Sequence, residues 1–240
     1  MALEKAEAPI YTPHIGESRQ YWRDIILGVN DGLVSTYLLV VGVVGGGFVI
    51  GDVFLTGVAG ALAGAVSMAA GEYLATKSQD QILAAELTLE REHLRDHRGQ
   101  EVDQLRGFFL DMGVSDEDID GVVAAFDRSD DAMLNAMAAL EFGVVESERR
   151  SPYLAMVASG GLFLVGAMPS VVPFAIFDTT GTALIWASAL AFGSLFVVGV
   201  IKASVAKTGK IKSGLENLAI AGVGGVVAWA IGTAVGATLA

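Results

Sequence analysis

The stretch VFLTGVAGALAGAVSMAAG, residues 53–71, contains no charged side chain. As a helix that rises about 1.5 Å per residue, its 19 residues cover a hydrocarbon core of about 30 Å. Four further charge-free stretches are as long or longer, at residues 33–51, 151–177, 179–201 and 217–240. The sequence therefore predicts an all-α membrane protein with five transmembrane helices.

The composition supports a membrane protein. The mean hydropathy is +0.56 and 53% of the residues are hydrophobic, more apolar surface than one soluble core of this length normally buries. The chain has no cysteine, which excludes disulfides and thiolate metal sites. Residues 1–10 carry Glu4, Lys5 and Glu7 without an apolar core, so we expect no cleaved signal peptide.

The basic residues predict the orientation. They lie in the N-terminal arm, around the insert of residues 78–150 and in the connection at residues 202–212, whereas the turns near Asp52 and Asp178 hold none. By the positive-inside rule, the N-terminus and the insert are cytoplasmic and the C-terminus faces outside. Because the chain is short and carries no organelle address, we expect the host to be a bacterial inner membrane.

The net charge of −12 is concentrated in the insert between the second and third transmembrane helices. Residues 78–150 contain 18 acidic residues and 7 arginines. This excess of negative charge argues against a nucleic-acid partner. The sequence thus predicts three parts, residues 1–77, 78–150 and 151–240. For most of these carboxylates, solvation alone is a sufficient explanation.

The insert is predicted to contain three helices. Residues 79–109 are rich in strong helix formers, with Gly99 as their weak point. A second helix is expected from Ser115, where the spacing to Asp118 is typical of a cap. Ser129 is the expected cap of a third helix.

Polar side chains recur along the first of these helices at intervals of three or four residues. At about 100° per residue, they fall on one stripe. Carboxylates and imidazoles without thiolates suit Mn(II), Fe(II), Co(II) and Zn(II), so the stripe is a candidate metal site. Its members are Glu86, Glu90, His93, His97, Glu101 and Gln104.

The third helix of the insert adds further candidate ligands. Met133, Met137 and Glu141 are spaced four residues apart, so a thioether and a carboxylate can face the stripe. Two methionines at this spacing are more often part of a packed core, and that alternative stays open.

Two carboxylates lie within the predicted membrane region. Asp31 and Glu72 are expected about 10 Å and about 8 Å inside its cytoplasmic edge, with Met68 one turn deeper than Glu72. A charged residue at depth costs at least about 2.5 kcal/mol and usually marks an ion or proton route. The alternative is that Asn30-Asp31-Gly32 forms a turn before the helix.

Small residues and prolines shape the predicted membrane helices. Gly60 with Gly64, and Gly232 with Gly236, form small-xxx-small faces that permit close helix packing. The third helix is expected to bend at Pro169 and Pro173.

Four motifs, taken together and in this order, resemble the vacuolar iron transporter family, also called the VIT1/CCC1 family. The resemblance spans nearly the whole chain. The motifs are Asp31-Gly32-Leu33-Val34-Ser35-Thr36, Ser67-Met68-Ala69-Ala70-Gly71-Glu72-Tyr73, Met137-Ala138-Ala139-Leu140-Glu141-Phe142-Gly143 and Met168-Pro169-Ser170-Val171-Val172-Pro173.

The resemblance implies a five-helix homodimer in the lipid bilayer that exports Fe(II), and often Mn(II), from the cytoplasm in exchange for protons. It implies no enzymatic activity and no prosthetic group, with the metal as a transported or regulatory ion. The transport route would use Asp31, Met68 and Glu72. The three-helix cytoplasmic insert would bind metal through Glu90, His93, Glu101, Gln104, Met137 and Glu141.

The chain departs from the family pattern at two of these positions. His93 and Gln104 stand where the family usually has glutamates. Fewer charged oxygens weaken the binding of hard cations, and a neutral imidazole makes metal capture sensitive to pH between about 5 and 8. The family's usual helix break falls near Gly99, which would divide the stripe into two halves.

The leading hypothesis is therefore a proton-coupled metal exporter, and two alternatives remain. A membrane-anchored ferritin-like oxidase or metal sensor needs two Glu-x-x-His pairs, and the insert has only Glu90 with His93. The second alternative is that the insert is purely structural and acts as a dimerisation domain with a solvated acidic face.

Overall fold

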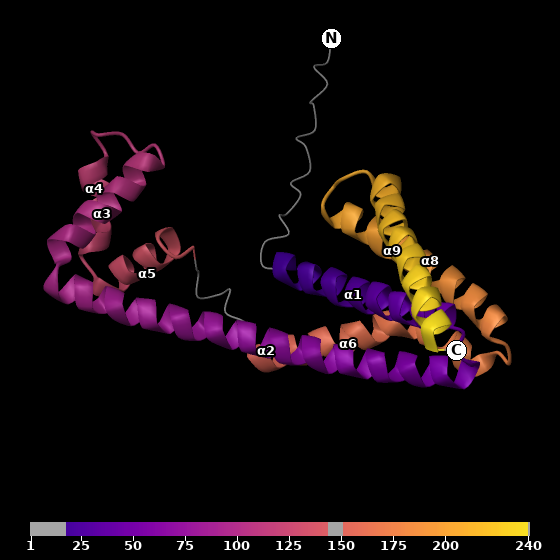
Figure 1. Cartoon of the computed structure of the whole chain (residues 1–240). Coiled ribbons are helices and arrows are strands. Elements are labelled where there is room, and N and C mark those ends of the chain that lie inside the picture. The colour runs from indigo at the N-terminus through magenta and orange to yellow at the C-terminus, as the bar shows by residue number, and fades with distance from the viewer. Residues whose placement is uncertain (1–17, 144–150, 240) are drawn as a thin grey trace, which may run out of the picture. The chain divides into compact units, whose positions relative to one another are not determined.

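The protein is built from α-helices. The computed structural model describes residues 18–143 and 151–239, and no β-strand occurs among them. The expectation for residues 1–10 lies outside this range. The helices shown in Figure 1 are α1 (Ser18–Gly45), α2 (Ile50–Asp96), α3 (Arg98–Asp111), α4 (Ile119–Asp127), α5 (Asp130–Leu140), α6 (Pro152–Val171), α7 (Pro173–Ile176), α8 (Thr180–Val205) and α9 (Lys210–Leu239).

Five of these helices are long and apolar enough to cross a membrane. They are α1, α2, α6, α8 and α9, and their charge-free parts correspond to the five stretches found in the sequence. The prediction of an all-α protein with five membrane-spanning helices is therefore confirmed at this level. At about 1.5 Å per residue, the 47 residues of α2 extend about 70 Å, so only part of α2 fits within a bilayer core.

Helix α1 begins well before its charge-free stretch. It includes Asn30, Asp31 and Gly32, so the alternative that these residues form a turn is wrong. The apolar residues 25–29 already belong to the helix, and no proline interrupts it. The turn comes after Gly45, where Gly47 has a φ of +81°, a conformation that favours glycine.

The chain divides into two compact units. The first comprises residues 1–65 and 161–240. In it, α1, α8 and α9 pack against one another and α7 packs against α8 (Figure 1). A row of alanines on α8, including Ala183, Ala187 and Ala191, is fully buried, which allows its neighbours to approach closely.

Glycines permit backbone contact between the membrane helices of this unit. Gly232 and Gly236 of α9 face the backbone of Gly42 in α1 and of Gly46, which directly follows α1, and a Cβ atom at Gly232 would overlap the carbonyl oxygen of Gly42. The small-xxx-small pattern thus serves packing within the chain.

The predicted bend in the third membrane helix is a break. Pro169 lies inside α6, which ends at Val171, and Pro173 begins the short helix α7. Proline is favoured at the first position of a helix because its missing N–H has no intrahelical partner there.

The second unit comprises residues 66–160, a range that includes the whole insert of residues 78–150. Here α3 packs against α4 and α5, and α4 packs against α5. Their shared apolar cluster contains Leu94, Leu105, Met133, Leu134 and Met137.

The single helix predicted over residues 79–109 is wrong. Residues up to Asp96 continue α2, His97 interrupts the helix with φ −133° and ψ 26°, and α3 begins at Arg98. The break lies two residues before Gly99, close to where the family resemblance implies it, and Gly99 itself lies within the first turn of α3. The bend lets Leu94 of α2 and Leu105 of α3 enter the same apolar cluster, which outweighs the local preference for a continuous helix.

The other two predicted helix starts have different outcomes. The Ser115 hydroxyl donates to Asp118 within a turn, and α4 begins only at Ile119, so the predicted start at Ser115 is wrong. Ser129 is the N-cap of α5 as predicted, because its Oγ accepts a hydrogen bond from the Ala132 N–H at 3.3 Å.

Substitution of Gly232 tests the close packing of α1 and α9. We expect Gly232→Ala to destabilise the protein by about 1–3 kcal/mol, because the added methyl group forces the two backbones apart. Gly222→Ala on the same helix is the control, since a Cβ atom there meets no atom within 4 Å. Thermal unfolding in detergent measures both, and equal melting temperatures for the two variants would contradict this prediction.

Candidate metal centre

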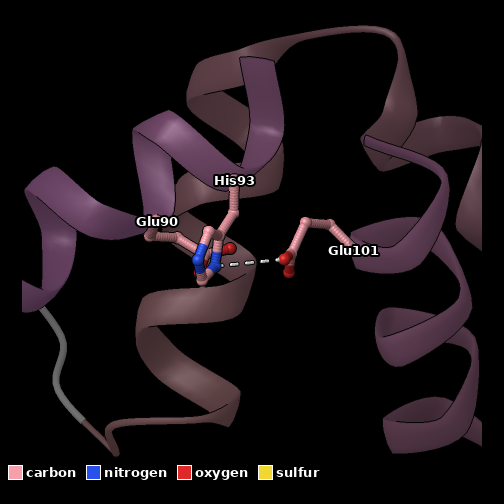
Figure 2. A group of neighbouring side chains, drawn as sticks. All are labelled: Glu90, His93 and Glu101. Carbon is pink, nitrogen blue, oxygen red and sulfur yellow. Dashed lines mark ion pairs between the residues drawn. The ribbon is translucent and has the colours of Figure 1, made fainter. Parts of the chain in front are cut away.

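The bend at His97 brings together three side chains that can bind a metal. Glu90 and His93 lie near the C-terminal end of α2, and Glu101 lies in the first turn of α3. Figure 2 shows the three side chains converging from the two helices. One ligand atom from each lies within 4.8 Å of the others. Among residues 18–143 and 151–239, this is the one group of three or more His, Asp or Glu side chains with such geometry.

The imidazole lies between the two carboxylates. His93 Nδ1 is 3.3 Å from Glu101 Oε1 and 4.0 Å from Glu90 Oε2. Glu90 and Glu101 are only 3% and 5% exposed, whereas His93 is half-buried. The carboxylates thus form the interior of the group, and the imidazole lies closer to solvent.

Two oxygens of this group are buried without a hydrogen-bond partner. They are Glu90 Oε1 and Glu101 Oε2. Burying a charged oxygen without a partner is costly, and in proteins such groups are paired, bind metals or take up a proton. Two carboxylate oxygens and one imidazole nitrogen therefore suit a divalent first-row metal ion.

The acidity of Glu90 reflects this environment. The pKa of Glu90 is raised to about 7, chiefly by burial and also by the negative charges of Glu101 and Glu141, while the nearby His93 lowers it. Glu90 lies 19 residues beyond Gly71, where the charge-free part of α2 ends, so it is outside the membrane-spanning segment. A metal ion bound by Glu90 would have to displace this proton near neutral pH.

The other predicted ligands have different surroundings. Glu86 is half-buried one turn before Glu90, and His97 and Gln104 are exposed. The His97 ring lies 6.2 Å from that of His93. Met137 is fully buried in the apolar cluster, where it acts as core. Glu141 is the C-cap of α5, and its charge reaches Glu90.

The predicted transport residues are also helical. Asp31 is exposed on α1, and among the described residues no ion pair to its carboxylate is found. Met68 and Glu72 are half-buried on α2 and, four residues apart, share one face. Asp31 belongs to the first unit, and Met68 and Glu72 belong to the second.

Comparison with known proteins identifies the family. Residues 22–233 match the model of the VIT family, which covers most of the chain. The chain belongs to the VIT family. This confirms the resemblance seen in the sequence motifs.

Curated relatives of this VIT-family chain carry transporter names. The chain is 26% identical over 213 residues to "Vacuolar iron transporter 1" of Tulipa gesneriana, covering 89% of this chain and 86% of the relative. It is 26% identical over 217 residues to "Protein CCC1" of Saccharomyces cerevisiae, covering 86% and 66%. A 74-residue match to "Vacuolar iron transporter homolog 4" of Arabidopsis thaliana is 47% identical and covers 30% of this chain and 36% of the relative.

The pKa of Glu90 makes the stability of the metal-free protein depend on pH. Because the folded-state pKa of about 7 exceeds the ordinary value of 4.5, the folded protein binds more protons than the unfolded chain between these values. The free energy of unfolding therefore falls as pH rises from about 4.5 to 7. At about 1.4 kcal/mol per pKa unit, the loss at pH 8 is at most about 3.5 kcal/mol.

We expect Glu90→Gln to raise the melting temperature of the metal-free protein at pH 8 and to change it little at pH 5. Glu86→Gln, one turn earlier on α2, is the matched control. Thermal unfolding in detergent with a chelator measures both. A Glu90→Gln effect that is the same at both pH values would contradict the prediction.

Proposed function

We propose that this VIT-family protein is a divalent metal transporter that moves Fe(II) out of the cytoplasm in exchange for protons, with Mn(II) as a second cargo. The insert collects the ion, and the membrane helices carry it across. The protein acts as a transporter rather than as an enzyme. The names of the curated relatives, which describe iron transporters, support this proposal.

One observation carries the proposal. The buried group of Glu90, His93 and Glu101 combines two carboxylates with an imidazole and leaves two carboxylate oxygens without partners. The same helix, α2, also carries Met68 within its charge-free part and Glu72 directly after that part. A metal-collecting site and polar residues at membrane depth on one helix fit a transporter better than an anchored binding protein.

Carboxylates allow the same route to serve both cargoes. A carboxylate binds either a proton or a metal ion, so Asp31 and Glu72 can release one when they take up the other. The thioether of Met68, one turn from Glu72, is a soft ligand that favours Fe(II) over Mg(II) or Ca(II). In this proposal, Asp31, Met68 and Glu72 form the transport route.

The distribution of basic residues supports an orientation with the N-terminus and the insert in the cytoplasm and the C-terminus outside. We propose a homodimer as the assembly, as the family resemblance implies. The bacterial inner membrane stays a prediction from the sequence, and the curated plant relatives are named for the vacuole. The metal roles of Gln104, Met137 and Glu141 also stay predictions.

The oxidase alternative has less support. A ferritin-like di-iron site uses two Glu-x-x-His pairs and two further glutamates, and the described residues contain one cluster with one histidine. Iron oxidation by the full-length protein, independent of a proton gradient, would favour it.

Substitution of the route carboxylates tests the transport proposal. In proteoliposomes with an imposed pH gradient, we expect Asp31→Asn and Glu72→Gln each to reduce Fe(II) flux at least tenfold, because neither amide can exchange a proton for a metal ion. Asp52→Asn, an exposed acidic residue in the first turn of α2, is the control and should transport normally. Unchanged flux in both route variants would remove the proposed mechanism.

His93 tests the choice of metal at the insert. We expect His93→Glu to strengthen Mn(II) binding relative to Zn(II), because a third carboxylate oxygen suits hard cations better than an imidazole does. The competition of the two ions for the full-length protein in detergent measures the ratio. His97→Glu is the control, since His97 is exposed and lies outside the group. The same shift in both variants would show that the ratio depends on overall charge alone.

A further inference from the structure

We propose that Arg98 is a positioning residue for the metal centre. Its guanidinium holds the start of α3 against the junction of α4 and α5, and thereby keeps the Glu101 carboxylate within reach of Glu90 and His93. The inference rests on the metal site proposed above. It assigns a role to a side chain that does not itself bind the ion.

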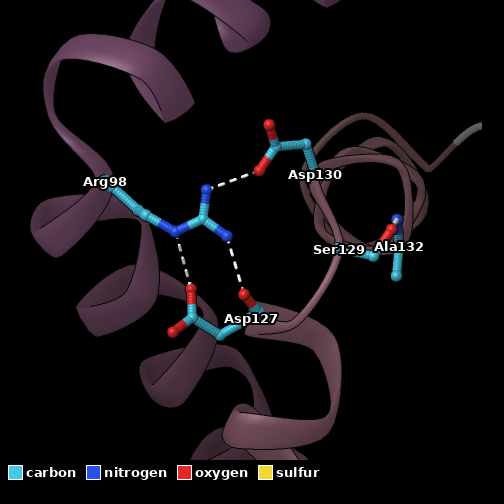
Figure 3. A network of polar contacts seen from close by, with 5 residues as sticks. All are labelled: Arg98, Asp127, Ser129, Asp130 and Ala132. Carbon is cyan, nitrogen blue, oxygen red and sulfur yellow. Dashed lines mark hydrogen bonds and ion pairs between the residues drawn. The ribbon is translucent and has the colours of Figure 1, made fainter.

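Arg98 joins three helices through one side chain, as Figure 3 shows. Its Nε donates to Asp127 Oδ1 at 2.8 Å, and one terminal nitrogen donates to the Asp127 carbonyl oxygen at 2.7 Å. The other terminal nitrogen donates to Asp130 Oδ1 at 2.5 Å. Asp127 is the last residue of α4 and Asp130 the first of α5. The start of α3 is therefore tied to both.

These hydrogen bonds of Arg98, called the tether below, lie directly after the bend between α2 and α3. His97 is the one residue between α2 and α3, so a change in its backbone angles moves all of α3. Arg98 follows it directly, and Glu101 lies three residues later in the same first turn. Glu90 and His93 are on the other side of the bend. Helix α5 packs against α2 through Met137 and Leu94 in the apolar cluster, so tying the start of α3 to α5 limits the movement of Glu101 relative to Glu90 and His93.

The tether also sets the position of α5. Ser129, between the two aspartates, caps this helix through the Ala132 N–H (Figure 3). At the other end of α5, Glu141 lies close enough for its charge to act on Glu90. Arg98 thus orients α3, which carries Glu101, and α5, which has Glu141 at its end. These two carboxylates bring negative charge close to Glu90 of α2.

The role requires an arginine rather than any cation. The Arg98 side chain is 37% exposed, and a single ion pair at such exposure contributes little to stability. A planar guanidinium, however, presents several donors in fixed directions and satisfies three acceptors at once, whereas a lysine ammonium is a compact charge on a flexible stem. The packing of Leu94 and Leu105 in the apolar cluster remains without the tether, so its loss loosens the centre without unfolding the insert.

The first experiment measures Co(II) binding to the full-length protein in detergent by visible absorption. We expect Arg98→Ala and Arg98→Lys to weaken binding about tenfold or more, equivalent to about 1.4 kcal/mol. Arg106→Ala is the matched control, because Arg106 links the same helix to Asp120 of α4 but not to α5. Its affinity should stay within about twofold of the wild type. Wild-type affinity in both Arg98 variants would overturn the proposal.

A double-mutant cycle shows whether Arg98 acts through Glu101. We expect Glu101→Gln alone to weaken Co(II) binding, and Arg98→Ala to add little in that background. Fully additive effects would overturn the positioning role. Unchanged binding in Glu101→Gln alone would instead overturn the metal site itself, so the two failures are distinguishable.

A distance measurement separates positioning from a general loss of fold. The chain contains no cysteine, so spin labels can be placed at introduced cysteines without removing native ones. Ala85 on α2 and Ala124 on α4 are both exposed. Between these labels we expect a narrow distance distribution in the wild-type background and a broad one in Arg98→Ala, narrowed again by saturating Zn(II). An unchanged distribution in Arg98→Ala would contradict the proposal.

Discussion

The insert depends on one constraint, the burial of two carboxylates beside each other in an apolar setting. Glu90 and Glu101 are each almost fully enclosed, and one oxygen of each lacks a partner. Such burial is costly for a charged pair and is relieved by a proton or a metal ion. A site that exchanges a proton for a metal ion near neutral pH is what the proposed proton-coupled metal carrier needs.

Apolar packing creates this burial. Leu94 and Leu105 enter the same cluster with Met133 and Met137, which requires the chain to bend at His97. The bend sets Glu101 opposite the end of α2. The polar centre is thus a consequence of how hydrophobic residues on either side of it pack.

Much of the fold could be predicted because it follows from local properties of the chain. A charge-free stretch of 19 residues is long enough to span a bilayer whatever its neighbours are, and Ser129 caps a helix through an N–H three residues away. The start of α4 was missed because the Ser115 hydroxyl bonds to the Asp118 side chain instead of to a backbone N–H. Helix propensity gave no signal for the break at His97.

Composition and residue pattern were sufficient to predict a helical chain with five segments of membrane length, and they marked Glu90, His93 and Glu101 as candidate ligands. The prediction placed these residues on one face of a single helix. In the structure, a bend between two helices brings Glu101 to Glu90 and His93 and leaves Gln104 exposed. The position of Glu101 beside Glu90 and His93 became clear from the three-dimensional structure, as did the partners of Arg98, which lie 29 and 32 residues away. Hydropathy and capping act over a few residues, whereas the direction of a helix after a break depends on contacts between segments far apart in the chain.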